Sequence, residues 1–170
     1  TIVVFTSDHG EWLGEHFRYG KGHPGADVVS RVPLIVRWPA GMTNTGHTES
    51  QLVEAVDVLP TLLACAGIQT PAHLQGQEFS AALEATETEF EGREGVLMEH
   101  TGWKSIRTAQ YRYLLHDDGR EMLWNLTNDP SEYKDCADDD AYAEVLATHR
   151  FLLAQRLIKM ERPLPRIWTY

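Results

Sequence analysis

The sequence predicts an α/β fold in which a mainly parallel sheet with helices precedes a small antiparallel sheet and a long C-terminal helix. An apolar run over residues 1–7 ends abruptly in Asp8, His9 and Gly10, which is typical of a strand buried on both faces of a parallel sheet. Beyond it, apolar residues recur at helical steps, and from Gly95 the period changes toward two. We therefore expect two units, residues 1–95 and 96–170.

The first unit contains two expected strands and one main helix. After the strand at residues 1–7 comes a polar, glycine-rich loop, and residues 32–38 form a second buried strand with Pro33 at its start, where no ladder hydrogen bond is needed. Residues 51–66 predict a helix, which Pro60 should kink or divide. Its apolar stripe consists of Leu52, Val56, Leu59, Leu63 and Ala66.

The second unit is expected to be a sheet of four short strands covered by a helix. A short helix near residues 80–85 precedes it, and Asp117-Asp118-Gly119 is a hairpin signal between the third and fourth strands. The strands are expected at residues 95–100, 103–108, 112–116 and 121–125. The long helix should begin at Asp139 or Asp140 and run to about Glu161, and Pro163 and Pro165 should end it.

Composition narrows the classes of function. The hydrophobic content of 42% and charged content of 24% are ordinary for a soluble globular protein. The net charge of −10 disfavours nucleic acid as a partner, because phosphate binding needs a basic face. Cys65 and Cys136 give neither a disulfide framework nor metal-ligand spacing. No transmembrane span or signal peptide is recognisable, so localisation stays open.

Asp8 and His9 are the strongest candidates for chemistry. Ligands of open α/β sheets bind just beyond the carboxyl ends of the strands. A carboxylate oxygen and an imidazole nitrogen at such a position can share one divalent cation, and Gly10 lets the backbone turn directly after them. The alternative is that Asp8 caps the turn and His9 is a surface histidine.

Three residues of the following loop are further candidates. Lys21 lies between Gly20 and Gly22, so the backbone can approach an anion closely while the ammonium supplies a point charge. The surrounding residues do not match a P-loop, and a solvated loop lysine is the alternative. His16 and His23 could each protonate a leaving group, although most loop histidines have no catalytic role.

These motifs, taken in order, resemble the carboxy-terminal part of a sulfatase of the alkaline phosphatase superfamily. Residues 4–16 resemble the second metal-binding segment of that family, and Gly20-Lys21-Gly22 followed by residues 31–39 resembles its sulfate-contacting lysine and next core strand. The remaining matches are the helix after that strand and the small C-terminal sheet, at residues 56–63, 106–113 and 123–130.

The resemblance implies part of an alkaline-phosphatase-like sandwich and an enzyme that hydrolyses a small sulfate ester. In such enzymes a formylglycine, made from a Cys/Ser-x-Pro/Ala-x-Arg motif, attacks sulfur while a divalent cation neutralises the sulfate oxygens. Asp8 and His9 would be metal ligands, and Lys21 would be both catalytic and substrate-binding. His16 would bind substrate, and His23 would assist the leaving alcohol. The implied cation is Ca²⁺ or Mn²⁺, with Zn²⁺ possible.

Two departures from the family pattern bear on these expectations. The nucleophile motif is absent, since neither Cys65 nor Cys136 is followed by the required residues. We therefore expect the chain to be about the last third of the enzyme, inactive without the missing N-terminal part. In addition, His9 stands where many sulfatases have asparagine, and relatives with Asp-His include phosphonate and phosphate diester hydrolases. Imidazole suits calcium poorly, so the metal and the choice between sulfur and phosphorus stay open.

Two alternatives to a sulfatase follow. One is a phosphonate monoester or phosphodiester hydrolase on the same scaffold, which would take a phosphonate or phosphate ester. The other is a non-catalytic module that binds an anion or a partner. The tail from Arg166 to Tyr170 could dock on another subunit, although the favoured alternative is that it packs on its own domain. A homo-oligomer also stays open.

Overall fold

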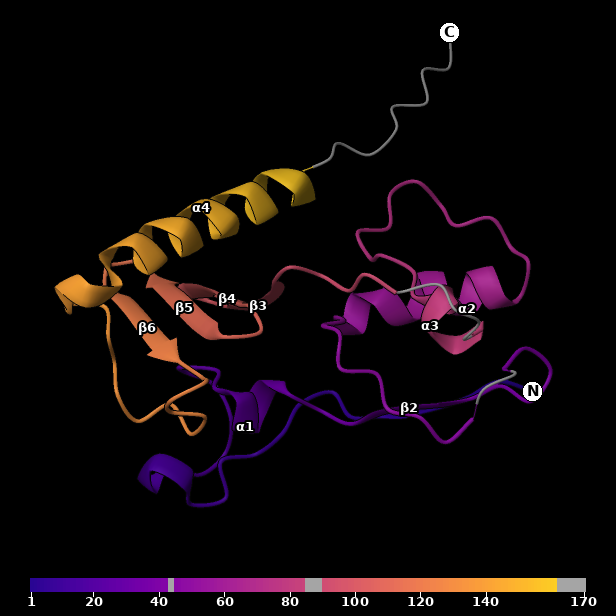
Figure 1. Cartoon of the computed structure of the whole chain (residues 1–170), viewed down its shortest axis with the longest axis horizontal. Coiled ribbons are helices and arrows are strands. Elements are labelled where there is room, and N and C mark those ends of the chain that lie inside the picture. The colour runs from indigo at the N-terminus through magenta and orange to yellow at the C-terminus, as the bar shows by residue number, and fades with distance from the viewer. Residues whose placement is uncertain (43–44, 85–89, 162–170) are drawn as a thin grey trace, which may run out of the picture.

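The structure is a computed structural model that describes residues 1–42, 45–84 and 90–161 (Figure 1). It contains a two-stranded sheet, a four-stranded sheet and helices associated with each. The tail from Arg166 to Tyr170, together with Pro163 and Pro165, lies outside the described residues. None of the helices in the described part of the chain has the length and apolarity that a membrane crossing requires.

The first sheet pairs β1 (Val3–Thr6) with β2 (Leu34–Arg37) in antiparallel register, with Val4 opposite Val36. The expectation of a parallel pair buried on both faces is therefore wrong for these strands. An apolar run indicates burial but carries no information on strand direction, which the path of the chain between the strands decides.

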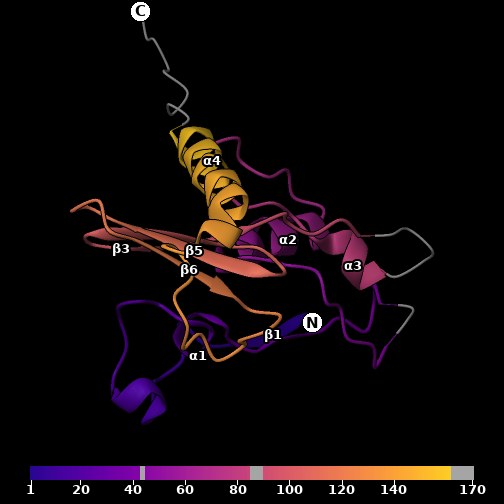
Figure 2. The same cartoon turned by 60° about the vertical axis from the view of Figure 1, so that its left-hand side comes forward.

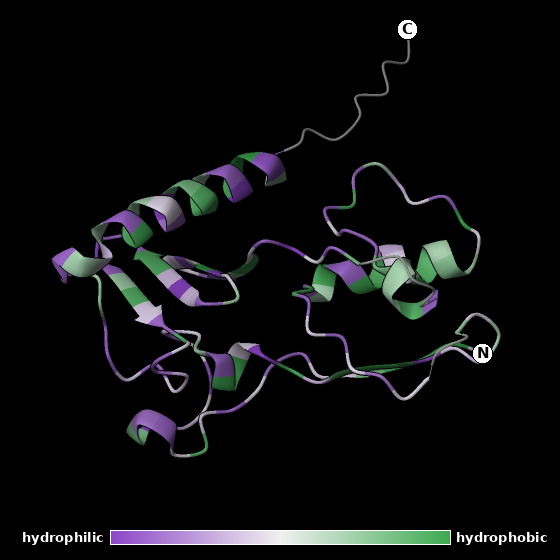
Figure 3. Ribbon diagram, viewed as in Figure 1, coloured by the Kyte–Doolittle hydropathy of each residue, from purple (hydrophilic) through white to green (hydrophobic). Residues whose placement is uncertain are grey.

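One face of this sheet is open. Val3, Phe5 and Ile35 are 49%, 60% and 61% exposed, while the opposite face meets α2 (Val58–Cys65) and α3 (Ser80–Glu84). A small hollow between them is lined by Val4, Val36, Val58, Thr61, Leu62, Phe79 and Leu83. Figure 3 shows hydrophobic residues along both strands and α2.

The helix expected over residues 51–66 is shorter than predicted. A 3-10 turn (Ala55–Asp57) leads into α2, which begins only at Val58 and is not divided at Pro60. Pro60 lies in the first turn, where proline is tolerated because the backbone N–H groups there have no intrahelical acceptor. Leu52 therefore precedes the helix, and Cys65 at its end is half-buried.

The second sheet follows the sequence prediction closely. Its order is β3 (Val96–His100), β4 (Trp103–Arg107), β5 (Tyr111–His116) and β6 (Glu121–Asn125), all antiparallel. The predicted turn at residues 117–119 joins β5 to β6, and Gly119 has a φ of 87°, in the left-handed region that glycine adopts readily. The predicted short helix is α3.

A long helix, α4 (Ala143–Met160), covers one face of this sheet (Figure 2). It is preceded by a 3-10 turn (Asp140–Tyr142), which Asp139 caps by accepting a hydrogen bond of 3.0 Å from the amide of Ala141. The core between sheet and helix contains Ile106, Tyr113, Leu123, Leu146 and Leu153.

The other face of the second sheet carries a separate cluster and meets the N-terminal loop. Trp103, Leu114, Trp124 and Leu126 are buried there. Figure 2 shows α1 (Asp27–Ser30) and the loop before it on this side, opposite α4. The loop that carries Lys21 and His23 thus packs against the C-terminal sheet.

Candidate functional site

The carboxyl end of β1 presents Asp8 and His9. The amide of His9 donates to Asp8 Oδ1 at 2.9 Å, and His9 Nε2 lies 3.5 Å from Asp8 Oδ2. This amide is the main reason that the pKa of Asp8 is lowered, so the carboxylate is the favoured form. The Asp8 side chain is 83% exposed, which leaves its oxygens accessible to a ligand.

Gly10 fixes the backbone directly after these residues. Its amide donates to the carbonyl oxygen of Val29 at 2.7 Å, so the end of β1 is tied to α1. A Cβ at this position would lie 2.1 Å from the carbonyl oxygen of Val28, closer than any side chain can approach. Glycine is therefore required here by close backbone contact.

The glycine-rich loop folds back so that Lys21 reaches His9. The amide of Trp12 donates to the carbonyl of Gly20 at 3.0 Å, and Glu11 accepts from the amide of Gly20. The ammonium of Lys21 then lies 2.9 Å from His9 Nε2. The structure thus brings together three of the residues singled out in the sequence: Asp8, His9 and Lys21.

The contacts of His9 fit a metal ligand. Its Nδ1 lies 2.7 Å from the carbonyl oxygen of Gly10, and a bond to this acceptor requires the proton on Nδ1. In the neutral ring, Nε2 then carries the lone pair, which lies 2.9 Å from the ammonium of Lys21 and 3.5 Å from Asp8 Oδ2. A backbone carbonyl that fixes the tautomer in this way is a common support of metal-binding histidines.

Two donors do not complete a metal site. Within residues 1–42, 45–84 and 90–161, no group of three or more His, Cys, Asp or Glu side chains is arranged to hold a metal ion. A cation bound by Asp8 and His9 would need further ligands from elsewhere.

His23 lies two residues beyond Lys21, against the second sheet. Its ring centroid is 6.1 Å from that of Trp103 and 5.8 Å from that of His116. Its Nδ1 is buried without a hydrogen-bond partner among the described residues. Burial, followed by the positive charge of Arg18, lowers the pKa of the imidazole, so the neutral ring is favoured.

This lowered pKa makes stability depend on pH. The unfolded chain binds the proton of His23 more tightly than the folded chain, so stability should fall as the pH drops below about 6.5. We expect the loss between about pH 7.5 and 5.5 to be smaller in His23→Gln than in the unsubstituted protein, measured by urea unfolding. An imidazole titration midpoint above 6.5, followed by NMR, would contradict the burial of this ring.

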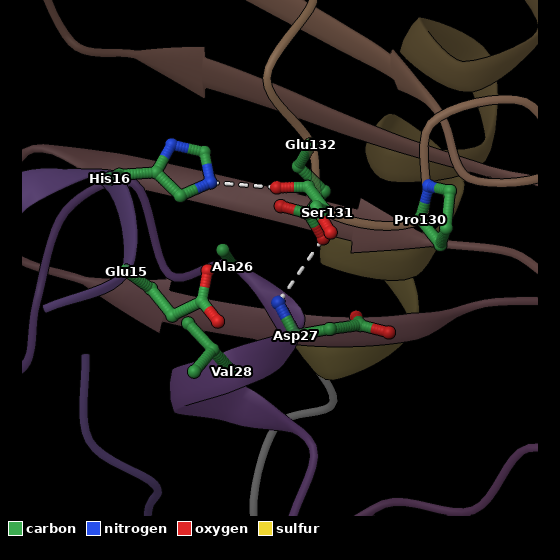
Figure 4. A pocket seen from close by; sticks show the side chains of 8 residues that line it. All are labelled: Glu15, His16, Ala26, Asp27, Val28, Pro130, Ser131 and Glu132. Carbon is green, nitrogen blue, oxygen red and sulfur yellow. Dashed lines mark hydrogen bonds between the residues drawn. The ribbon is translucent and has the colours of Figure 1, made fainter. Parts of the chain in front are cut away.

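His16 lies elsewhere, against the turn that follows β6. Its Nε2 is 2.6 Å from the carbonyl oxygen of Ser131, and its ring stacks on Tyr133 at a centroid distance of 4.1 Å. It borders a hollow of about 110 Å³ (Figure 4). The hollow is lined by Glu15, His16, Ala26, Asp27, Val28, Pro130, Ser131 and Glu132. The structure thus does not bring His16 into contact with Asp8, His9 or Lys21.

Sequence reasoning did not single out Arg112, Glu132 and His116, all of which lie against the loop. Arg112 and Glu132 form a buried ion pair beneath it, and His116 faces His23. Arg112 lies within a predicted strand, where a charged residue in an alternating pattern indicates a solvent-facing position. The sequence signal that could have drawn attention to it is the apolar run that surrounds the arginine, from Tyr111 to Leu115.

Comparison with known families identifies the chain. Residues 14–162 match the model of a family described as "N-sulphoglucosamine sulphohydrolase, C-terminal". The chain belongs to this sulfatase family. The matched residues include Lys21 and His23 in the loop and the whole C-terminal sheet that the loop contacts. The recognition of a sulfatase from the sequence motifs is therefore confirmed.

Similar proteins support the assignment. The sulfatase YidJ of Escherichia coli K12, which is uncharacterised, is 32% identical over 171 residues, covering 96% of this chain and 33% of the relative. This sulfatase-family chain therefore spans about a third of the length of such relatives.

Solved structures share the fold. BT4656, in complex with its substrate D-glucosamine-2-N,6-O-disulfate, matches with a TM-score of 0.85 and 27% identity, covering 95% of this chain and 35% of that one. The phosphonate monoester hydrolase of Agrobacterium radiobacter matches with a TM-score of 0.84 and 26% identity, covering 94% of this chain and 35% of that one. The solved structures that share this fold thus include one in complex with a sulfated substrate and one phosphonate monoester hydrolase.

Proposed function

We propose that this chain forms the C-terminal part of a metal-dependent sulfuric ester hydrolase and carries one side of its active site. The observation that carries the proposal is the meeting of Asp8, His9 and Lys21 at the end of β1, in a chain that belongs to a sulfatase family. The remaining metal ligands and a formylglycine nucleophile are proposed to come from an upstream segment, and residues 1–95 are proposed to complete the catalytic domain with it.

In this proposal each of the candidate site residues has a defined role. Asp8 and His9 hold one divalent cation, Ca²⁺ or Mn²⁺, with Zn²⁺ also accommodated by the imidazole. The bound cation supplies Lewis-acid stabilisation of the sulfate oxygens. Lys21 places an ammonium where negative charge develops on the sulfate and the departing oxygen. His23 assists the leaving alcohol as a neutral ring whose N–H donates a hydrogen bond to the departing oxygen, because burial lowers the pKa of the imidazole and disfavours the cation.

His16 is proposed to serve the substrate site through the loop that carries Lys21. Its ring contacts Ser131 and Tyr133 and so ties the loop to the turn after β6, five residues before Lys21. The proposed substrate class is sulfated sugars, because the BT4656 structure contains a glucosamine disulfate substrate.

A phosphonate or phosphodiester hydrolase is the second candidate. Two observations favour it: His9 in place of a pure oxygen ligand, and the similarity to the Agrobacterium phosphonate monoester hydrolase. In both candidates Asp8 and His9 would hold the cation and Lys21 would face the anionic ester group, so the proposed roles of these residues suit either substrate.

The test compares the two ester classes on the full-length gene product. We expect kcat/KM for para-nitrophenyl sulfate to exceed that for para-nitrophenyl phenylphosphonate by at least about tenfold, which corresponds to about 1.4 kcal/mol of transition-state binding. Rates should be measured after chelation and after addition of Ca²⁺ or Mn²⁺. A reversed preference would select the phosphonate hydrolase, and no turnover of either ester with any cation would leave a non-catalytic binding module.

A further inference from the structure

The buried pair of Arg112 on β5 and Glu132 after β6 is unusual for its complete enclosure. Arg112 is 0% and Glu132 3% exposed, and the Arg112 Nε donates to Glu132 Oε2 at 2.9 Å. The guanidinium also lies 3.9 Å from the ring centroid of Trp124. Burying two charges carries a desolvation cost that their attraction often fails to recover, so stability alone explains such a pair poorly.

Each partner of the pair also holds the backbone just after His23. The Arg112 Nη1 donates to the carbonyl oxygen of Pro24 at 2.8 Å, and Glu132 Oε1 accepts from the amide of Asp27 at 3.1 Å. The pair therefore binds the backbone of the loop at two positions, Pro24 and Asp27, and Pro24 is three residues from Lys21. Figure 4 shows the bond between Glu132 and the amide of Asp27.

The surroundings reinforce these two contacts. Glu132 has a φ of 60°, a strained left-handed conformation for a residue that is not glycine, and its carboxylate is buried against Arg112. Arg107 of β4 adds a bond from its Nε to Asp27 Oδ1 at 2.9 Å. Trp12 at the start of the loop is buried, at 1% exposed, but the apolar side chains between it and Lys21 are open, since Phe17 and Tyr19 are 99% and 80% exposed. A segment with few buried contacts depends on such tethers for its order.

We propose that the Arg112–Glu132 pair positions Lys21 and His23 for reaction by clamping the backbone that follows them onto the C-terminal sheet. The inference rests on the proposed function for the roles of Lys21 and His23. Arg112 and Glu132 act as positioning residues, because their side chains contact the loop backbone and not the reacting groups. A misplacement of about 1 Å is enough to lower a rate by about a hundredfold.

The decisive variant is the double substitution Arg112→Met and Glu132→Met in the full-length gene product. Removing both charges together leaves no unpaired buried ion, so the sheet should remain folded while both tethers are lost. Hydrogen exchange followed by mass spectrometry should show at least tenfold faster exchange in peptides spanning residues 18–29. Peptides from β5, β6 and α4 should be unchanged. On the proposed sulfate ester, kcat should fall at least tenfold with KM within threefold.

A matched control is Arg150→Met with Glu121→Met, which removes an ion pair between α4 and β6, on the face of the sheet opposite the loop. It should change neither loop exchange nor kcat. Arg112→Lys keeps the charge but not the forked geometry, so residues 18–29 should still exchange faster in this variant than in the unsubstituted protein.

Unchanged exchange in residues 18–29 of the double variant would overturn the inference, as would faster exchange with an unaltered kcat. If the unsubstituted enzyme hydrolyses no sulfate ester, the proposed function fails. The exchange measurement then tests by itself whether the Arg112–Glu132 pair holds the loop in place.

Discussion

Replacing Asp8 with asparagine is expected to abolish most of the activity of the full-length enzyme and to lower its metal content. The substitution keeps the size of the side chain but removes the negative charge that a divalent cation requires. A bound cation supplies several kcal/mol of transition-state stabilisation, so kcat/KM should fall by about a thousandfold or more. The measurements are initial rates and metal content per protein after dialysis.

Two comparisons make the Asp8 result specific. Lys21→Met removes the ammonium beside His9, and it should reduce turnover while the metal content stays near one equivalent. Asp138→Asn changes an exposed carboxylate remote from the loop, and it should alter neither quantity. If Asp8→Asn retains full metal content and activity, Asp8 is not a ligand and the proposed site is wrong.

The C-terminal sheet could be predicted from the sequence because its signals are local. Period-two patterns and the turn at residues 117–119 define four strands that pair with their neighbours along the chain. The apolar stripe of α4 is equally local. Predictions failed where a choice depended on distant parts of the chain: the direction of β1 against β2, and the start of α2 after a 3-10 turn.

The candidate site was predicted in part for the same reason. Asp8 and His9 are adjacent in sequence, and Lys21 is marked by its two glycines, but their contact follows from loop packing that no local pattern encodes. The support beneath the loop was missed altogether. Arg112 meets the carbonyl of Pro24 across a sequence separation of 88 residues. Complete burial of that arginine becomes apparent only when β5, Trp124 and Glu132 surround it.

Replacing Asp57 with alanine is expected to cause the largest loss of stability of any single substitution considered for this chain. Asp57 is 1% exposed and accepts hydrogen bonds from the amides of Glu54 at 2.8 Å and Gln77 at 2.7 Å. It also forms an ion pair with Arg93, whose Nε lies 2.8 Å from Asp57 Oδ2. One carboxylate thus connects the start of α2, the segment before α3 and the segment that leads into β3.

Alanine would leave these donors buried without their acceptor. Breaking a buried ion pair by removing one partner costs about 3–5 kcal/mol. Since folded domains are stable by only about 5–15 kcal/mol, the variant should unfold at a much lower urea concentration. Asp139→Ala is the matched control, because it removes a single exposed cap and should cost about 1 kcal/mol.

Asp57→Asn separates the loss of charge from the loss of shape. The amide keeps one acceptor oxygen, so part of the network survives, but its NH₂ group faces Arg93 or a backbone amide that also donates. Its stability should therefore lie between those of the unsubstituted protein and the alanine variant. If Asp57→Ala and Asp139→Ala cost the same in urea unfolding, the Asp57 network contributes no more than a surface cap. The joint between α2 and β3 would then depend on the remaining contacts of Glu54 with Leu97 and Arg156.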